Sequence, residues 1–212
     1  MHLTLHLTED CNMSCVYCAQ THSHRKMSLK TARAAVDFAL SATNHNKKMC
    51  DPGYTGICFF GGEPLLQRVI IEGVVKYCSE LTEKTKNVFK FNVVTNGTLM
   101  DDSFLNFACA NNIKIDLSHD GLMHHKTRLM DNGLSSFDSL EAKVDLLLRY
   151  LPESSALCTV HPDYADRLAD SVDWLLDRGF KKVHTVPAIG THIIWTEDAL
   201  EKLKKQYFIL SE

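Results

Sequence analysis

The chain has 212 residues, of which 45% are hydrophobic and 23% charged, a composition typical of a globular protein with one sizeable core. A formal net charge of −3 and a pI near 6.4 argue against a nucleic-acid-binding surface, which normally carries a basic stripe. No stretch reaches the ~18 consecutive apolar residues of a membrane span, and the first ten residues lack the pattern of a secretory signal. We therefore expect a cytoplasmic protein whose eight cysteines stay reduced.

Six short apolar segments alternate with helical patterns along the chain. Ser28, Pro64 and Thr196 are suited to begin helices, and Gly179 is suited to follow the end of one. The helix that begins at Pro64 is expected to turn these apolar residues toward a core: Leu66, Val69, Ile70, Val74 and Tyr77. The predicted strands cover residues 3–7, 56–60, 89–95, 113–118, 156–160 and 182–189.

Strict alternation of strands and helices with short connections predicts right-handed βαβ units and a parallel sheet. A closed barrel of eight such units typically takes ~250 residues. Six units in 212 residues therefore predict an α/β fold of the open kind, a partial (βα)6 TIM-like barrel with outer helices. A doubly wound sheet is the alternative that periodicity alone leaves open.

Both architectures place a ligand site at the carboxyl ends of the strands. The segments that follow the first four strands carry polar and turn-forming residues. They are the three cysteines Cys11, Cys15 and Cys18, the stretch Gly61–Pro64, the stretch Thr95–Thr98, and the stretch Ser118–Gly121 with Arg128 beyond it.

The three cysteines of "CNMSCVYC" form a group without a fourth member nearby, because the next cysteine, Cys50, lies beyond a whole predicted helix. Soft thiolates select zinc, copper(I) or iron–sulfur clusters. Structural zinc sites usually close with four ligands. A [4Fe–4S] cluster held at three corners leaves one iron free for a substrate or cofactor. Spacing alone does not name the metal.

"CNMSCVYC" resembles the cysteine signature of the radical S-adenosylmethionine (radical SAM) superfamily, with Tyr17 in its aromatic position. "FFGGEPLL", "VVTNGTLM" and "IDLSHDG" followed by Arg128 are similar to the later motifs of that superfamily in order and spacing. The resemblance implies a [4Fe–4S] cluster and S-adenosylmethionine as cofactors. It also implies reductive cleavage of S-adenosylmethionine to methionine and a 5′-deoxyadenosyl radical that abstracts a substrate hydrogen.

By this resemblance, Cys11, Cys15 and Cys18 hold the cluster, whose fourth iron is chelated by the methionyl amine and carboxylate of S-adenosylmethionine. Glu63 would accept from the methionyl ammonium, and Arg128 would form a fork for the carboxylate. The other cofactor-binding residues that the resemblance implies are Tyr17, Gly61, Gly62, Asn96, Ser118 and Ala188.

Several of these residues also have an ordinary structural explanation. Glu63 suits a helix N-terminus and Arg128 an ordinary loop ion pair, while Asn96 and Asp120 each suit a turn before a glycine. His124 and His125 are expected in a solvated loop. The remaining cysteines are expected to behave as small buried hydrophobes: Cys50, Cys58, Cys78, Cys109 and Cys158.

The order of the motifs is most similar to the branch of anaerobic sulfatase-maturating enzymes and peptide maturases. We expect residues 1–212 to form a single radical SAM core domain without that branch's cysteine-rich C-terminal domain, either as a fragment or as a small stand-alone enzyme. The resemblance implies a peptide or protein substrate and an external one-electron reductant of the flavodoxin or ferredoxin type. Two alternatives stay open, a radical enzyme for a small metabolite or nucleotide and a truncated, non-catalytic iron–sulfur or metal-binding module.

Overall fold

The computed structural model describes residues 1–45 and 54–211. All six predicted strands are present, with ends that differ from the prediction by no more than two residues. Among the described residues they are β1 (His2–His6), β2 (Tyr54–Phe60), β3 (Val88–Thr95), β4 (Ile113–Ser118), β5 (Ser155–Val160) and β6 (Val183–Pro187).

The order of the strands in the sheet is the order of the chain, β1 to β6. β1–β2, β2–β3, β4–β5 and β5–β6 are parallel pairs. A doubly wound sheet would reverse its strand order at a switch point, so that alternative is excluded. The prediction of an open, parallel α/β sheet of the partial-barrel kind is confirmed.

By their contacts the described residues divide into two compact units. The first comprises Met1–Cys11, Thr21–Thr95 and Ser103–Ile115, and the second comprises Asn12–Gln20, Asn96–Asp102 and Asp116–Glu212.

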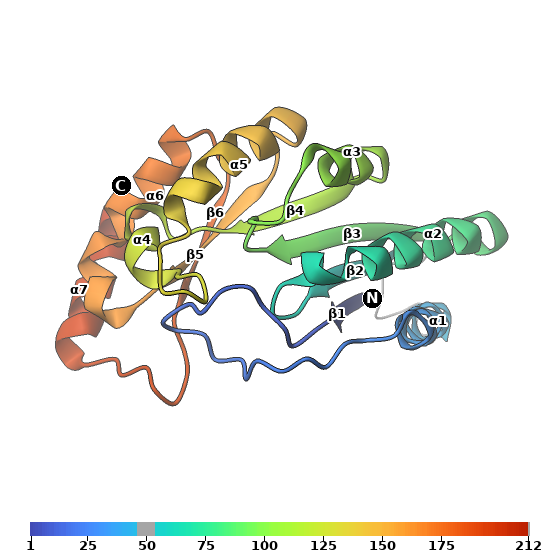
Figure 1. The fold of residues 1–212 in the computed structure, drawn as a ribbon, viewed down its shortest axis with the longest axis horizontal. Coiled ribbons are helices and arrows are strands. Elements are labelled where there is room, and N and C mark those ends of the chain that lie inside the picture. Colours follow the sequence, from blue (N-terminus) through green and yellow to red (C-terminus); the bar gives the residue numbers. More distant parts are fainter. Residues whose placement is uncertain (46–53, 212) are drawn as a thin grey trace. The chain divides into compact units, whose positions relative to one another are not determined.

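In the first unit, α1 (Leu29–His45) and α2 (Arg68–Thr85) contact each other and the strands β1 to β3 (Figure 1). Most of α3 (Asp102–Ala110) also belongs to this unit. Ser28 begins α1 as predicted, because its Oγ accepts a 3.0 Å hydrogen bond from the Thr31 amide. The core of this unit includes Leu5, Leu7, Val36, Ile57, Phe59, Ile71 and Val93.

The predicted core face of the second helix is wrong for its first turn. Leu66 is exposed and Val69 is 76% exposed, because Pro64–Gln67 forms a separate 3-10 turn (η1) and α2 begins only at Arg68. A 3-10 turn has three residues instead of 3.6, so helical spacing counted from Leu66 loses its phase. The residues of α2 that face the core are Ile71, Val74, Val75 and Cys78.

In the second unit, α6 (Leu168–Asp177) contacts α7 (Glu197–Ile209), β5 and β6 (Figure 1). Thr196 begins α7 as predicted, since its Oγ1 accepts from the Ala199 amide. Gly179 follows α6 with a φ of +106°, a backbone conformation that favours glycine. The other helical segments of this unit are η2 (Gly121–Met123), α4 (His124–Thr127), α5 (Phe137–Tyr150) and η3 (Pro162–Arg167).

The cysteines outside the motif are only partly the buried residues that the sequence predicts. Cys78 and Cys158 are buried, but Cys58 and Cys109 are half-buried. Cys50 lies outside the described residues. No disulfide joins the seven cysteines in the described part of the chain. Among residues 1–45 and 54–211, no helix is both long enough and apolar enough to cross a bilayer.

Candidate cofactor-binding site

In the first unit, the backbone after β2 lies directly against the backbone after β1. The Gly62 amide donates to the Thr8 carbonyl at 2.8 Å, and the Glu63 amide donates to the Asp10 carbonyl at 2.9 Å. A Cβ on Gly62 would stand 2.2 Å from the Asp10 oxygen and 3.1 Å from the Cβ of Cys11. The glycine is therefore required by the close approach of the segment that carries the first cysteine.

Gly61 is needed for the same contact. Its φ is +148°, and a Cβ there would stand 2.5 Å from the Thr8 carbonyl oxygen. The resemblance implies that both glycines lie beside a cofactor. The structure identifies the immediate neighbour as the chain's own residues 8–11, so that the two glycines determine where Cys11 begins its loop.

Glu63 is fully buried at the N-terminus of η1. Its Oε1 accepts from the Leu65 amide at 2.9 Å and from the Thr95 hydroxyl at 2.7 Å. The structural alternative, a residue at a helix N-terminus, is thus confirmed. The role of Glu63 toward a methionyl ammonium stays a prediction.

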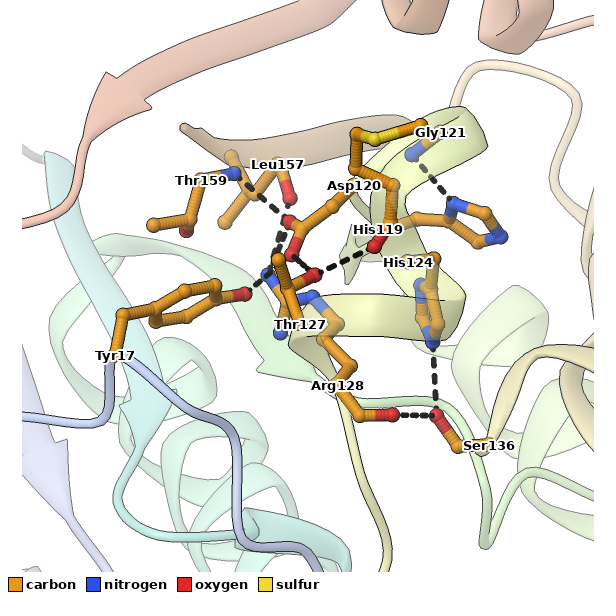
Figure 2. A network of polar contacts seen from close by, with 11 residues as sticks. Tyr17, His119, Asp120, Gly121, His124, Thr127, Arg128, Ser136, Leu157 and Thr159 are labelled. Atoms are coloured by element: carbon orange, nitrogen blue, oxygen red, sulfur yellow. Dashed lines mark hydrogen bonds and ion pairs between the residues drawn. The ribbon is translucent and has the colours of Figure 1, made fainter. Parts of the chain in front are cut away.

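In the second unit, Asp120 is the centre of a buried polar network (Figure 2). Its Oδ2 accepts from the Tyr17 hydroxyl at 2.6 Å and from the Thr127 hydroxyl at 2.7 Å. Its Oδ1 accepts from Arg128 Nη2 at 2.9 Å and from the Thr159 amide at 2.9 Å. One carboxylate therefore connects the cysteine segment, the α4 region and the end of β5.

Arg128 is 6% exposed and forms its ion pair with Asp120 inside this network. Burial acts to lower the pKa of Arg128, but the adjacent Asp120 carboxylate outweighs burial and the pKa is raised. The guanidinium carbon lies 5.4 Å from the centre of the Tyr17 ring. Arg128 Nε is buried and has no hydrogen-bond partner among the described residues.

The cysteine segment of this unit is paired with the segment that carries Arg128. The Ser14 amide donates to the Leu129 carbonyl at 2.8 Å, and the Val16 amide donates to the Thr127 carbonyl at 2.9 Å. Cys15, between these two anchor points, has a pKa raised by burial and lowered in part by Arg128. The residues predicted as a thiolate ligand and as a carboxylate fork are thus close neighbours.

Tyr17 is also part of this arrangement. Burial is the main cause of its raised pKa, and its hydroxyl is bound to Asp120. The structure therefore brings together Cys15, Tyr17 and Arg128 of the predicted residues. Their roles toward S-adenosylmethionine stay predictions.

Three further predicted residues lie in ordinary structural settings. Asn96 donates to Asn12 Oδ1 at 2.9 Å and accepts from the Thr98 amide at 3.0 Å, as the turn alternative predicts. Ser118 is half-buried at the last position of β4. Ala188 is buried just after β6, where its carbonyl accepts from Trp195 Nε1 at 2.8 Å. None of these contacts tests a role in cofactor binding.

Sequence reasoning missed two buried residues of this unit. It left Asp120 as an optional turn residue, and it predicted His124 in a solvated loop. The latter prediction is wrong: His124 is fully buried in α4, and its Nε2 lies 2.8 Å from Ser136 Oγ (Figure 2). The spacing of "SHDGLMHHKT" has no helical or strand periodicity, so the sequence carries no signal for this burial.

The three cysteines of the motif are suitable ligands for an iron–sulfur cluster that is bound by thiolates. Cys11, Cys15 and Cys18 form no disulfide and are half-buried, and thiolates are the usual ligands of iron–sulfur clusters. Among the described residues, no three His, Cys, Asp or Glu side chains already stand in a ligand arrangement around one point. The assignment of the three cysteines as ligands therefore stays a prediction from the motif.

Comparison with known proteins gives a match to the family model "Radical SAM superfamily" over residues 5–175. An uncharacterized protein of Methanocaldococcus jannaschii is 34% identical over 143 residues, which are 66% of this chain and 46% of that protein. A cysteine-type anaerobic sulfatase-maturating enzyme of Clostridium perfringens is 26% identical over 174 residues, 81% of this chain and 47% of the enzyme.

Among solved structures, native anSMEcpe with bound AdoMet and Cp18Cys peptide has a TM-score of 0.79 at 23% identity. The match covers 99% of this chain and 58% of that one, and it shows a shared fold. This chain spans about half the length of the curated relatives that it matches.

Proposed function

Because the chain belongs to the radical S-adenosylmethionine superfamily, we propose that it generates a 5′-deoxyadenosyl radical for hydrogen abstraction from a peptide or protein. Membership of the superfamily bears out the predicted cofactors, S-adenosylmethionine and a [4Fe–4S] cluster. When bound, the reduced cluster supplies the electron that cleaves the sulfonium. The observation that carries the proposal is the three-cysteine motif, Cys11 to Cys18, inside a family match over residues 5–175.

The chain's own part in this proposal is to bind and orient. Cys11, Cys15 and Cys18 hold the cluster as thiolates. Glu63 accepts from the methionyl ammonium, and Arg128 binds the methionyl carboxylate through its planar donors. The unpartnered, buried Nε of Arg128 supports this role, because a buried donor is stabilised by an acceptor that a ligand can supply.

The remaining contacts of the proposal come from the other residues that the motifs place at the cofactor. Gly61 and Gly62 place the Cys11 loop. Asn96 and Ser118 would bind ribose or carboxylate oxygens. Tyr17 and the backbone at Ala188 would lie beside the adenine.

The peptide or protein substrate is supported by the relatives. One is a sulfatase-maturating enzyme, and one structural neighbour holds a peptide together with AdoMet. The proposal includes an external one-electron reductant of the flavodoxin or ferredoxin type. The alternative is a small-metabolite substrate, and a screen of candidate substrates would distinguish it from a peptide or protein.

The organisation of the chain is also part of the proposal. Residues 1–212 would act as one radical SAM core domain. A location in the reducing cytoplasm fits the seven described cysteines, none of which forms a disulfide.

The test is anaerobic reconstitution with iron and sulfide, followed by iron analysis and a dithionite assay for 5′-deoxyadenosine. Cys11→Ala, Cys15→Ala and Cys18→Ala should each lose cluster absorption and product. Cys109→Ala, which removes a half-buried thiol in α3 outside the motif, is the matched control and should retain both. Iron uptake that survives replacement of all three motif cysteines, or uptake of zinc alone, would overturn the proposal.

A further inference from the structure

The carboxylate of Asp120 is saturated by donors from the protein. A carboxylate offers about four lone-pair positions, and Asp120 has four donors at 2.6 to 2.9 Å, two on each oxygen. Its side chain is 1% exposed. A group that is buried and fully occupied has no remaining position for a ligand, so Asp120 is unsuited to contact S-adenosylmethionine or substrate directly.

Two of these four donors belong to residues with a proposed role at the cofactor. Arg128 gives Asp120 one terminal nitrogen, and Tyr17 gives its hydroxyl. Figure 2 shows the Tyr17 and Arg128 side chains, which come from two different segments of the chain, reaching the same carboxylate. The other two donors, the Thr127 hydroxyl and the Thr159 amide, anchor the carboxylate to α4 and β5. Asp120 is thus fixed independently of the side chains it holds.

The way Arg128 is held leaves part of its guanidinium available. Asp120 takes only Nη2, whose other neighbour is the Leu157 carbonyl at 3.5 Å. Nε is buried and unpartnered among the described residues. An ion pair through both Nε and Nη2 would have occupied the Nε donor. The observed single-nitrogen contact neutralises the charge and still leaves a buried donor free.

We propose that Asp120 is a positioning residue, which holds Arg128 so that Arg128 Nε is presented to the carboxylate of S-adenosylmethionine. The inference rests on the proposed function, because it requires Arg128 to bind that carboxylate. Asp120 acts through Arg128, and its contribution disappears when Arg128 is absent. A direct ligand contact by Asp120 would instead persist.

The test is a double-mutant cycle on S-adenosylmethionine binding to the reconstituted protein, with Asp120→Asn, Arg128→Gln and the double variant. The dissociation constant is measured by equilibrium dialysis, and the cluster's EPR signal reports whether added S-adenosylmethionine reaches the iron. Arg128→Gln should weaken binding roughly tenfold or more, and Asp120→Asn roughly tenfold, as for loss of an outer partner. The double variant should bind no more weakly than Arg128→Gln alone.

Asp116→Asn is the matched control, since Asp116 lies nearby in β4 and its Oδ1 accepts from Ser155 Oγ at 2.5 Å. It should change the dissociation constant by less than about twofold. If Asp120→Asn does not fold, Asp120→Glu, which keeps the charge but displaces the carboxylate, takes its place in the cycle. The double variant is expected to fold, because replacing both members of a buried ion pair is tolerated better than removing one.

The outcomes separate the two proposals. Normal binding by Arg128→Gln overturns the proposed role of Arg128 and with it this inference. Weak binding by Arg128→Gln together with normal binding by Asp120→Asn overturns the inference alone. A double variant weaker than Arg128→Gln by the full factor of Asp120→Asn also overturns it, since additivity means that Asp120 does not act through Arg128.

Discussion

The Tyr17 hydroxyl donates a 2.6 Å hydrogen bond to Asp120 Oδ2, although 103 positions separate the two residues in the chain. The contact joins the cysteine segment to the residue that follows the end of β4. Both partners are buried, so the bond is made in a low-dielectric setting where an unpaired polar group is costly. The segment that carries Cys15 is thus held by a carboxylate far away in sequence, in addition to its backbone bonds to Thr127 and Leu129.

Tyr17→Phe removes this bond and leaves the buried Asp120 carboxylate with one donor fewer. Hydrogen bonds to charged groups contribute roughly 1.5–3 kcal/mol, so we expect a loss of about 2 kcal/mol in the free energy of unfolding, measured by urea denaturation. Tyr77→Phe is the control, because Tyr77 donates to Asp37 at 2.5 Å in a solvent-exposed contact. That variant should change the free energy by no more than about 0.5 kcal/mol. Equal losses in both variants would contradict the role given to burial.

Gly62→Ala should disturb the loop that carries Cys11. The added Cβ would stand 2.2 Å from the Asp10 carbonyl oxygen, a backbone atom that cannot rotate away. Overpacking of this kind typically costs about 1–3 kcal/mol, and we also expect reduced iron retention after reconstitution. Gly190→Ala, in an exposed segment with its nearest contact 3.2 Å away on the His192 ring, should be close to neutral. Full iron retention by Gly62→Ala would show that the close approach is dispensable.

Glu63→Gln separates the structural role of Glu63 from its proposed charge role. The amide oxygen can still accept from the Leu65 amide and the Thr95 hydroxyl, so the free energy of unfolding should fall by less than about 1 kcal/mol. The affinity for S-adenosylmethionine should fall about tenfold or more, because the charge opposite the methionyl ammonium is lost. Glu63→Ala should lose both the affinity and about 2 kcal/mol of stability. Unchanged affinity in Glu63→Gln would leave only the capping role.

Stability should fall on mild acidification because of two buried histidines. Burial lowers the pKa of His119 to about 3, and burial also lowers the pKa of His124. An unfolded histidine has a pKa of about 6.5. The contribution of the two neutral histidines to the free energy of unfolding is therefore fully present above about pH 6.5. For His119, this stability is lost as the pH falls through the window from about 6.5 to about 3, and His124 acts in the same direction.

The charged neighbours of these histidines do not reverse the lowering of their pKa values. Asp120 raises the pKa of His119, but Arg128 and Arg178 lower it, and Glu141 Oε1 is 3.9 Å from His119 Nε2. At about 1.4 kcal/mol per pH unit for each histidine, urea unfolding should show a loss of about 2 kcal/mol between about pH 7 and about pH 5.5. His124→Gln should reduce this slope, whereas His125→Gln, at an exposed position, should leave it unchanged. A flat profile over that range would contradict the buried, neutral state of the pair.

The order of strands and helices could be read from the sequence because it depends on local periodicity and on turn and capping residues. Ser28 and Thr196 begin helices as their side chains predict. The phase of α2 could not be read in this way, because the 3-10 turn Pro64–Gln67 precedes it and shifts the spacing. The error at Leu66 and Val69 is therefore one of helix type and not of helix position.

By itself the sequence determined the alternation that gives an open parallel sheet and the three-cysteine motif that identifies the superfamily, because both are written in residues close together in the chain. Only the tertiary structure decided that Asp120 is the buried partner of Tyr17 and Arg128, and that His124 lies in the interior. Burial and hydrogen-bond partners arise from segments that meet in space after folding. No local pattern in the chain records which segments those will be.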